Sequence, residues 1–276
     1  MAVSVLFPIS VPIMLLLLSG LIYRLLRHRN VRIQRRVIFA LMLVNVLQHL
    51  LKSWIYPHYY GAGVTLHSTA YNMCAVLILL SPLALLAHSR FVKNFVYFMG
   101  TAAGFGAVAY HIWILDMPIS NWEHFRFILC HTLLFITSSM PLLLRHHSPT
   151  RREYWQVGVG FLTALGIILL NNVLFITMGL LPGEGAADLY SQLVKCNPCM
   201  LMGPKDGFQW IVGAFETLSP KIFTGSNPTG RYVPILWYAL PVYAGISVLT
   251  YLMFAFLELQ TQKNDAANSE NKSEKL

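Results

Sequence analysis

Long apolar runs recur along the chain and limit strongly how it can fold. Seven such runs follow one another, and each approaches the length of about 20 residues that a helix needs to cross a bilayer. Charged residues make up 11% of the 276 residues and hydrophobic residues 56%, whereas a soluble domain carries about 25% charge. The sequence therefore predicts an all-α, polytopic membrane bundle of about seven transmembrane helices.

The predicted spans, the loop between the last two and the C-terminal tail divide the chain. The spans are residues 3–25, 36–55, 69–88, 91–113, 122–144, 155–178 and 233–257, within a transmembrane domain of residues 1–261. Residues 179–232 form a long outer loop, in which the amphipathic stretch 207–218 predicts a short interfacial helix. Residues 262–276 are polar and charged and predict a disordered cytoplasmic tail.

Basic residues gather in alternate loops and predict the orientation. The first, third and fifth loops carry Arg24, Arg27, Arg29, Arg32, Arg35, Arg36, Arg90, Lys93, Arg145, Arg151 and Arg152. By the positive-inside rule these loops are cytoplasmic, so the N-terminus lies outside and the C-terminus inside. The first span has no basic residues before it, which indicates an uncleaved helix rather than a signal peptide. The net charge of +9 then reflects topology, and we expect no nucleic-acid partner.

Polar side chains inside the apolar spans are the candidate site. At about 1.5 Å of rise per residue, Cys74 lies about 8 Å, His49 about 9 Å and His131 about 14 Å below the outer boundary. The full set, which falls in one layer of the outer half of the bilayer, is Asn45, His49, Asn72, Cys74, His131, Asn171 and Asn172. Polar groups are costly in hydrocarbon, so by default such a layer indicates function.

A cysteine and a histidine in this layer suggest nucleophilic chemistry. A thiol reacts as the thiolate, and a neighbouring imidazole can take its proton. Cys74 with His131 as base would attack a lipid ester to form a thioester, and an asparagine or second histidine would donate hydrogen bonds to the oxyanion. The alternative is structural, because buried cysteines usually pack and asparagines join helices. We expect no cofactor or metal.

Three further patterns favour packing or no role. Cys130 lies beside His131 and is interpreted as a packing residue. Gly100 and Gly104 form a GxxxG pattern, which is typical of close helix packing. Cys196 and Cys199 lack the second pair that a structural zinc site needs, which leaves a strained disulfide or no role, and we favour no role.

Three segments, taken in order, resemble the transmembrane protein 164 acyltransferase family. Asn72-Met73-Cys74, followed by Pro82, resembles the Asn-x-Cys opening of that family's third core helix. The segment FRFILCHTLLFITSSMPLLL at 125–144 resembles its histidine helix, and CNPCMLMGPKDGF at 196–208 resembles its outer-loop motif. Met73 stands where the animal sequences have proline, and the outer-loop match is imperfect.

The resemblance implies a membrane enzyme that moves a fatty acyl group between phospholipids through Cys74 and His131. It implies phospholipid or lysophospholipid substrates and membrane lipids as partners, in the cell membrane of a bacterium or an endomembrane of a eukaryote. Lipid-ester hydrolysis is the close variant of this reaction. The alternatives are a small-solute transporter or receptor that uses the polar layer as a binding site, and a non-catalytic membrane protein.

Overall fold

The computed structural model describes residues 2–55, 57, 65–114, 122–180, 188–204 and 209–273, in which every regular element is a helix. Within these residues, seven long helices occupy the seven predicted positions and confirm the all-α bundle. They are α1 (Ala2–Leu26), α2 (Val31–Ile55), α4 (Met73–Leu86), α5 (Arg90–Ile114), α6 (Trp122–Leu143), α7 (Trp155–Thr177) and α10 (Leu236–Ser273).

Shorter helices fill the connections. In chain order they are η1 (Leu66–Ser68), η2 (Arg151–Glu153), α8 (Leu189–Cys196), η3 (Pro198–Met200), α9 (Gln209–Leu218) and η4 (Lys221–Phe223). The long outer loop is thus partly folded, and α9 falls within the stretch predicted as an interfacial helix. Its placement at a membrane surface stays a prediction.

Several boundaries differ from the predicted ones. α2 begins at Val31 rather than at residue 36, and α4 begins at Met73 rather than at residue 69. α10 continues to Ser273, through most of the segment expected to be a disordered tail. Residues 262–276 contain neither glycine nor proline, and nine of the 15 are Lys, Ala, Glu, Gln or Leu, which favour helix even where no apolar face is buried.

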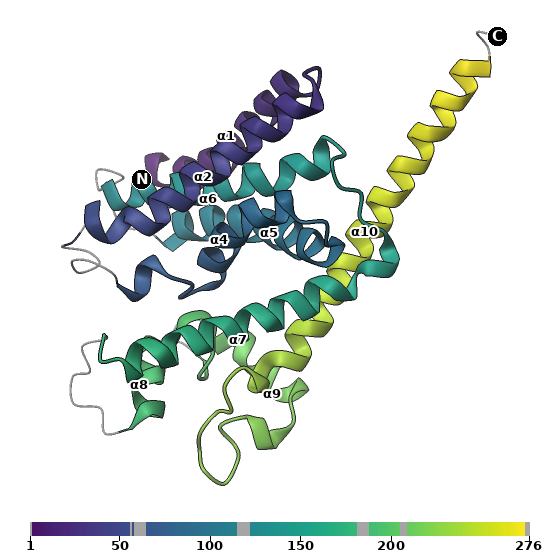
Figure 1. Ribbon diagram of the computed structural model, residues 1–276. Coiled ribbons are helices and arrows are strands. Elements are labelled where there is room, and N and C mark those ends of the chain that lie inside the picture. The colour runs from purple at the N-terminus through teal and green to yellow at the C-terminus, as the bar shows by residue number, and fades with distance from the viewer. Residues whose placement is uncertain are drawn as a thin grey trace.

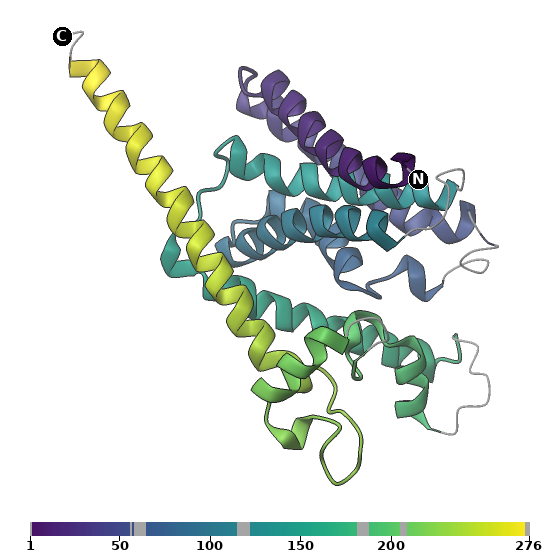
Figure 2. The ribbon, with the colours of Figure 1, turned by 180° about the vertical axis from the view of Figure 1, so that it is seen from behind.

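α5 lies at the centre of the bundle, with other long helices around it (Figure 1). It packs against α1, α4, α6 and α7, while α2 packs against α4 and α6. α10 packs against α7 and α9 and crosses the other long helices obliquely, as both ribbon views show (Figures 1 and 2). The core between these helices includes Ile38, Met42, Leu134 and Leu165, each 0% exposed.

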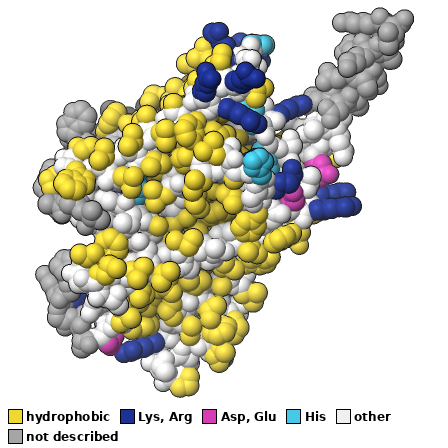
Figure 3. All heavy atoms as spheres, in the orientation of Figure 1, with side chains coloured by type: hydrophobic (Ala, Val, Ile, Leu, Met, Phe, Trp, Pro, Cys, Tyr) yellow, Lys and Arg dark blue, Asp and Glu magenta, His cyan; other side chains and the backbone are white. Residues whose placement is uncertain are grey.

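The face of the bundle seen in Figure 3 is largely apolar. Among the described residues, five helical segments are long and apolar enough to cross a membrane: Val31–Ile55, Leu66–Leu86, Glu123–Leu143, Arg151–Thr177 and Leu236–Gln262. Ser10–Leu26 of α1 is a shorter apolar helix. α5 is as long as α2 and is surrounded by four neighbouring helices. Its side chains therefore pack largely against other helices, whereas many side chains of α10 are exposed on the outside of the bundle.

The two ends of the bundle differ in charge. The α1–α2 and α6–α7 connections lie at the same end in Figure 1, and exposed arginines such as Arg27, Arg36, Arg145 and Arg152 gather there. Following the predicted orientation, this end is called the cytoplasmic end. The opposite end, where α2 ends and α4 and α6 begin, is called the outer end.

Candidate functional site

A cavity of about 60 Å³ lies at the outer end, among α2, α4 and α6. It is called the outer cavity, and its lining consists of His49, Lys52, Tyr71, Asn72, Cys74, Ala75, Ile78, Arg126, Phe127, Cys130 and His131. The structure therefore brings Cys74, His131, His49 and Asn72 together from three helices. The sequence predicted only that these residues lie at a similar depth, and the structure shows that these four line the same cavity.

Cys74 is held in the first turn of α4 by Asn72. Asn72 is the N-cap, with extended backbone angles (φ −146°, ψ 173°), and its Oδ1 accepts a hydrogen bond of 2.9 Å from the N–H of Ala75. This cap satisfies one of the amides that every helix start leaves open. The thiol thus sits at the positive end of a helix dipole, which favours a negative charge there, although burial among apolar groups opposes it.

His131 on α6 has its tautomer set by its own helix. Its Nδ1 is 2.8 Å from the carbonyl oxygen of Phe127, one turn earlier. A carbonyl oxygen only accepts, so Nδ1 carries the proton and Nε2 is the basic nitrogen of the neutral ring. The rings of Phe127 and His131 also lie 4.0 Å apart between centroids, which helps to fix the plane of the imidazole.

The GxxxG pattern of α5 sets how closely α6 approaches. A Cβ on Gly104 would lie 2.6 Å from the backbone nitrogen of Phe135 and 2.8 Å from the carbonyl oxygen of His131. A Cβ on Gly100 would lie 2.1 Å from Oγ of Ser138. The expected close helix packing is therefore confirmed, and it fixes the backbone that carries His131.

Lys52 and Arg126 were not predicted as site residues, because both lie near the outer ends of their predicted spans, 36–55 and 122–144, where charged residues are expected. Lys52 is 2% exposed, its Nζ lies 3.5 Å from Nδ1 of His49, and it stands 4.7 Å above the ring of Tyr71. The Nε2 of His49 in turn donates to the carbonyl oxygen of Thr69 at 3.0 Å. The signal was available, because residues 45, 49 and 52 follow the i, i+4, i+7 spacing of one helix face.

Arg126 enters the outer cavity from the first turns of α6. Its Nε donates to Oε2 of Glu123 at 2.8 Å, its second contact with that carboxylate completes a bidentate pair, and its side chain is 11% exposed. Arg126 precedes Cys130 by four residues, so the two share a helix face. Cys130 is 4% exposed, in agreement with the packing role predicted for it, and it also lines the cavity.

Three predicted asparagines lie outside the lining. Asn45 donates through Nδ2 to the carbonyl oxygen of Cys130 at 3.1 Å, which joins α2 to α6 beside His131. Asn171 donates to Oγ1 of Thr69 at 2.9 Å. Asn172 donates to the carbonyl oxygen of Ile168 at 2.7 Å, and its buried Oδ1 has no hydrogen-bond partner among the described residues. Asn45 and Asn171 therefore act on the helix framework around the cavity.

The Cys-Asn-Pro-Cys segment lies over the start of α4. The sulfur of Cys199 accepts a hydrogen bond from the backbone N–H of Met73, next to Cys74, and burial nevertheless raises the pKa of Cys199. Burial also raises the pKa of Cys196, and Cys74, Cys130, Cys196 and Cys199 are all free thiols. Within the described residues, no group of three or more His, Cys, Asp or Glu side chains is placed to hold a metal ion.

Asn197 folds this segment into a tight turn. Its Oδ1 accepts from the N–H of Met202 at 2.8 Å and its Nδ2 donates to the carbonyl oxygen of Gly203 at 3.0 Å. The rest of the sequence motif, residues 205–208, lies outside the described residues, as do His58 and the side chain of His111.

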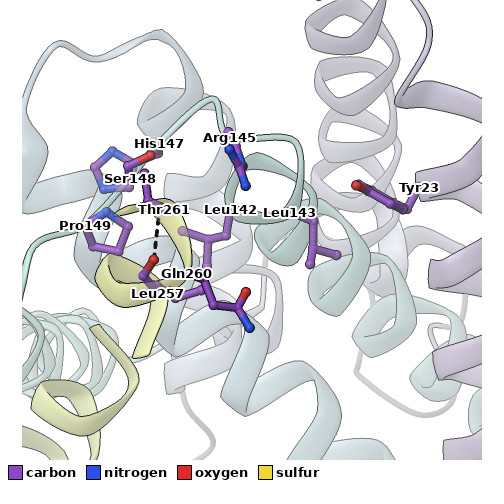
Figure 4. A pocket seen from close by; sticks show the side chains of 10 residues that line it. All are labelled: Tyr23, Leu142, Leu143, Arg145, His147, Ser148, Pro149, Leu257, Gln260 and Thr261. Carbon is purple, nitrogen blue, oxygen red and sulfur yellow. Dashed lines mark hydrogen bonds between the residues drawn. The ribbon is translucent and has the colours of Figure 1, made fainter. Parts of the chain in front are cut away.

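A second cavity, of about 220 Å³, opens at the cytoplasmic end (Figure 4). It is called the inner cavity, and its lining comprises Tyr23, Leu142, Leu143, Arg145, His147, Ser148, Pro149, Leu257, Gln260 and Thr261. Arg145 has a positive φ of 59° where α6 gives way to the loop. These residues hold no cysteine, so the two cavities differ in the chemistry available to them.

His147 belongs to a polar network behind the inner cavity. Its Nε2 donates to Oδ1 of Asn94 at 2.6 Å, and Nδ2 of Asn94 donates to Oε1 of Gln156 at 2.7 Å. Burial first, and then the charges of Arg90 and Lys93, lower the pKa of His147 to about 4. His147 is therefore a neutral structural group near neutral pH.

The apolar helices and the buried polar cavity together define a multi-pass helical membrane protein with its polar groups gathered near one end. Residues 3–206 match the TMEM164 family. The chain belongs to this family, and the match spans the segments that carry Cys74, His131 and the Cys-Asn-Pro-Cys turn. The comparisons with curated proteins and with solved structures found no match.

Proposed function

We propose that this protein is a membrane lipid acyltransferase in which Cys74 is the nucleophile and His131 the general base. The observation that carries the proposal is the outer cavity, in which both side chains form part of one lining. Membership of the TMEM164 family supports it, since the resemblance of the same segments implies acyl transfer.

The proposed reaction has two halves. In the first, Nε2 of His131 takes the thiol proton while Sγ of Cys74 attacks the ester carbonyl carbon of a donor lipid. The carbon–oxygen ester bond then breaks, the leaving alcohol receives the proton from His131, and a thioester remains on Cys74. In the second, an acceptor hydroxyl gives its proton to His131 and attacks the thioester carbonyl carbon, the carbon–sulfur bond breaks, and His131 returns the proton to Sγ of Cys74. With water as acceptor, the same steps amount to hydrolysis.

Asn72 is the proposed oxyanion donor. Its Oδ1 accepts a hydrogen bond from the N–H of Ala75. The NH₂ group of the same carboxamide is therefore the part of Asn72 that would donate a hydrogen bond to the oxyanion. A donor held in advance where charge develops lowers the barrier without reorganisation at the moment of reaction. His49 lies further from this role, because its Nε2 donates to Thr69 and its Nδ1 accepts from Lys52.

The size of the cavity favours a reaction centre over a solute-binding site. Ligand pockets for small molecules measure about 300–1,000 Å³, whereas the outer cavity measures about 60 Å³. That volume accepts an ester group and its immediate neighbours, while the acyl chains remain against the apolar surface of the helices. The volume therefore fits a reaction in which only the ester group of a lipid enters the cavity from the bilayer.

The test is acyl capture by purified protein in nanodiscs. A phospholipid with a labelled acyl chain is added, and peptide mass spectrometry locates any hydroxylamine-sensitive acyl group. We expect the label on Cys74, and we expect Cys74→Ala to lower acyl transfer by at least about a thousandfold. Cys196→Ala, in the outer loop, is the matched control. Unchanged transfer by Cys74→Ala, or label on Cys130 in its place, overturns the proposal.

A further inference from the structure

Two basic side chains line the outer cavity, one buried and one largely buried, and the proposed chemistry does not use them. Lys52 is 2% exposed, and the side chain of Arg126 is 11% exposed. A buried cation is costly unless the site gives it something to bind or to pair with. Glu123 meets this need for Arg126, and His49 and Tyr71 meet it for Lys52, so both cations are held in the lining, where a ligand that enters the cavity would meet them.

Both side chains are held in place by their neighbours. Arg126 forms a bidentate pair with Glu123 from the preceding turn, which fixes the plane of its guanidinium. Lys52 bonds to His49 and lies over the ring of Tyr71. Fixed cations of this kind suit recognition of a phosphate, because little side-chain entropy is lost when the anion binds.

Each of the two cations lies on the outer side of a histidine of the same helix. Arg126 precedes His131 by five residues on a helix that begins at the outer end, a rise of about 7.5 Å. Lys52 follows His49 on a helix that ends there, a rise of about 4.5 Å. The outer cavity thus has a basic outer tier and an inner tier that contains His131 and His49.

A glycerophospholipid has the same order of groups along its depth. Its phosphate lies at the membrane surface, and its ester carbonyls lie a few ångströms deeper, on the neighbouring glycerol carbons. A lipid whose ester reaches Cys74 from the bilayer therefore brings its phosphate to the level of the basic tier. A diacylglycerol presents the same esters and no phosphate.

We infer that Lys52 and Arg126 bind the phosphate of a glycerophospholipid substrate and so select phospholipids over neutral glycerolipids. The inference rests on the proposed function, which makes a phospholipid the substrate. It adds the residues that recognise the headgroup phosphate. Lys52 and Arg126 are binding residues in this scheme, while Cys74 and His131 react.

The experiment measures binding apart from reaction. A photo-crosslinkable phosphatidylethanolamine and a diacylglycerol with the same chains are titrated against Cys74→Ala protein in nanodiscs. We expect Lys52→Met and Arg126→Met each to weaken phospholipid binding by about tenfold or more, because a charge-assisted hydrogen bond is lost. Diacylglycerol binding should change by less than about twofold. Lys52→Arg, which keeps the charge, should retain phospholipid binding, and the exposed Lys221→Met is the matched control.

Equal weakening for both lipids, or unchanged phospholipid binding by both methionine variants, overturns the inference. Variants are compared only where size-exclusion profiles match wild type, and Lys52→Gln, which also removes the charge, replaces Lys52→Met if that variant does not fold. The two proposals fail separately. Charge-dependent phospholipid binding without acyl capture on Cys74 refutes the acyltransferase, whereas acyl capture from both lipids alike refutes the phosphate site.

Discussion

The outer and inner cavities show that cavity size and chemical capacity are separate properties of this bundle. The inner cavity measures about 220 Å³ and the outer about 60 Å³. The smaller one combines thiols, imidazoles and two cations from three helices, whereas the larger lies between the α6–α7 loop, α1 and α10 and has no thiol in its lining (Figure 4). Reactive side chains need neighbours that fix their geometry, which a packed junction of three helices supplies.

Histidine substitutions give the largest expected contrast between the cavities. His131→Ala should lower acyl transfer by about 10²–10⁴-fold, because the thiol would lose its proposed general base. His147→Ala should change the rate by less than about twofold, after correction for the folded fraction, since His147 is part of a structural network. The measurement is turnover of labelled phospholipid per folded protein. Losses of similar size in both variants would remove the functional distinction between the two ends.

Glycine substitutions in α5 test whether packing holds the outer cavity in shape. Gly104→Ala should lower the free energy of unfolding by about 1–3 kcal/mol, because its Cβ would meet the backbone of Phe135 and His131. Gly106→Ala is the matched control on the same helix, since nothing lies within 4 Å of its Cβ, and it should leave stability unchanged or slightly higher. Denaturant titration and turnover are measured together. Equal stability of the two variants would show that α5 does not fix α6.

Acid should destabilise the protein through His147. Its pKa is about 4 in the folded state and about 6.5 in an unfolded chain. Below pH of about 6.5 the unfolded state takes up a proton that the folded state does not, so stability falls as pH falls toward about 4. The contribution at pH of about 5 is up to about 2 kcal/mol.

Thermal unfolding of wild type and His147→Gln between pH of about 7.5 and 5 checks this effect. The glutamine variant retains a donor toward Asn94 and cannot titrate, so its stability should change less with pH. Parallel pH profiles for the two proteins would mean that His147 contributes nothing to acid sensitivity.

The smallest expected effect is on Arg145, an exposed basic residue of the inner cavity. Arg145→Gln should leave phospholipid turnover within about twofold of wild type, because exposed charges contribute little at this range. The buried Arg126, at the outer end, is the contrasting position. A tenfold or larger loss in Arg145→Gln would mean that the inner cavity also serves the reaction, and the difference between the ends would need revision.

The sequence by itself determined the seven helices, because runs of apolar residues near bilayer length have few other solutions. It also placed His131 and His49 in one layer, since helical rise converts residue number into depth, whereas the depth of Cys74 was counted from residue 69 and α4 begins at Met73. The extension of α10 was beyond this reasoning, because a polar segment reads as a tail although its residues favour helix. The start of α4 was misplaced by four residues for a related reason, since hydropathy does not reveal that Asn72 caps the helix.

Tertiary structure alone decided which members of the polar layer share a cavity. Depth says how far along a helix a residue lies and leaves open which face of the bundle it meets. Asn45, Asn171 and Asn172 have the depth of the site, yet they bond to backbone or to Thr69 outside the lining. Lys52 and Arg126 looked like boundary charges, and they turn into the outer cavity because α2, α4 and α6 meet there. Rotation about each helix axis depends on the packing of its neighbours, and that is a property of the assembled bundle.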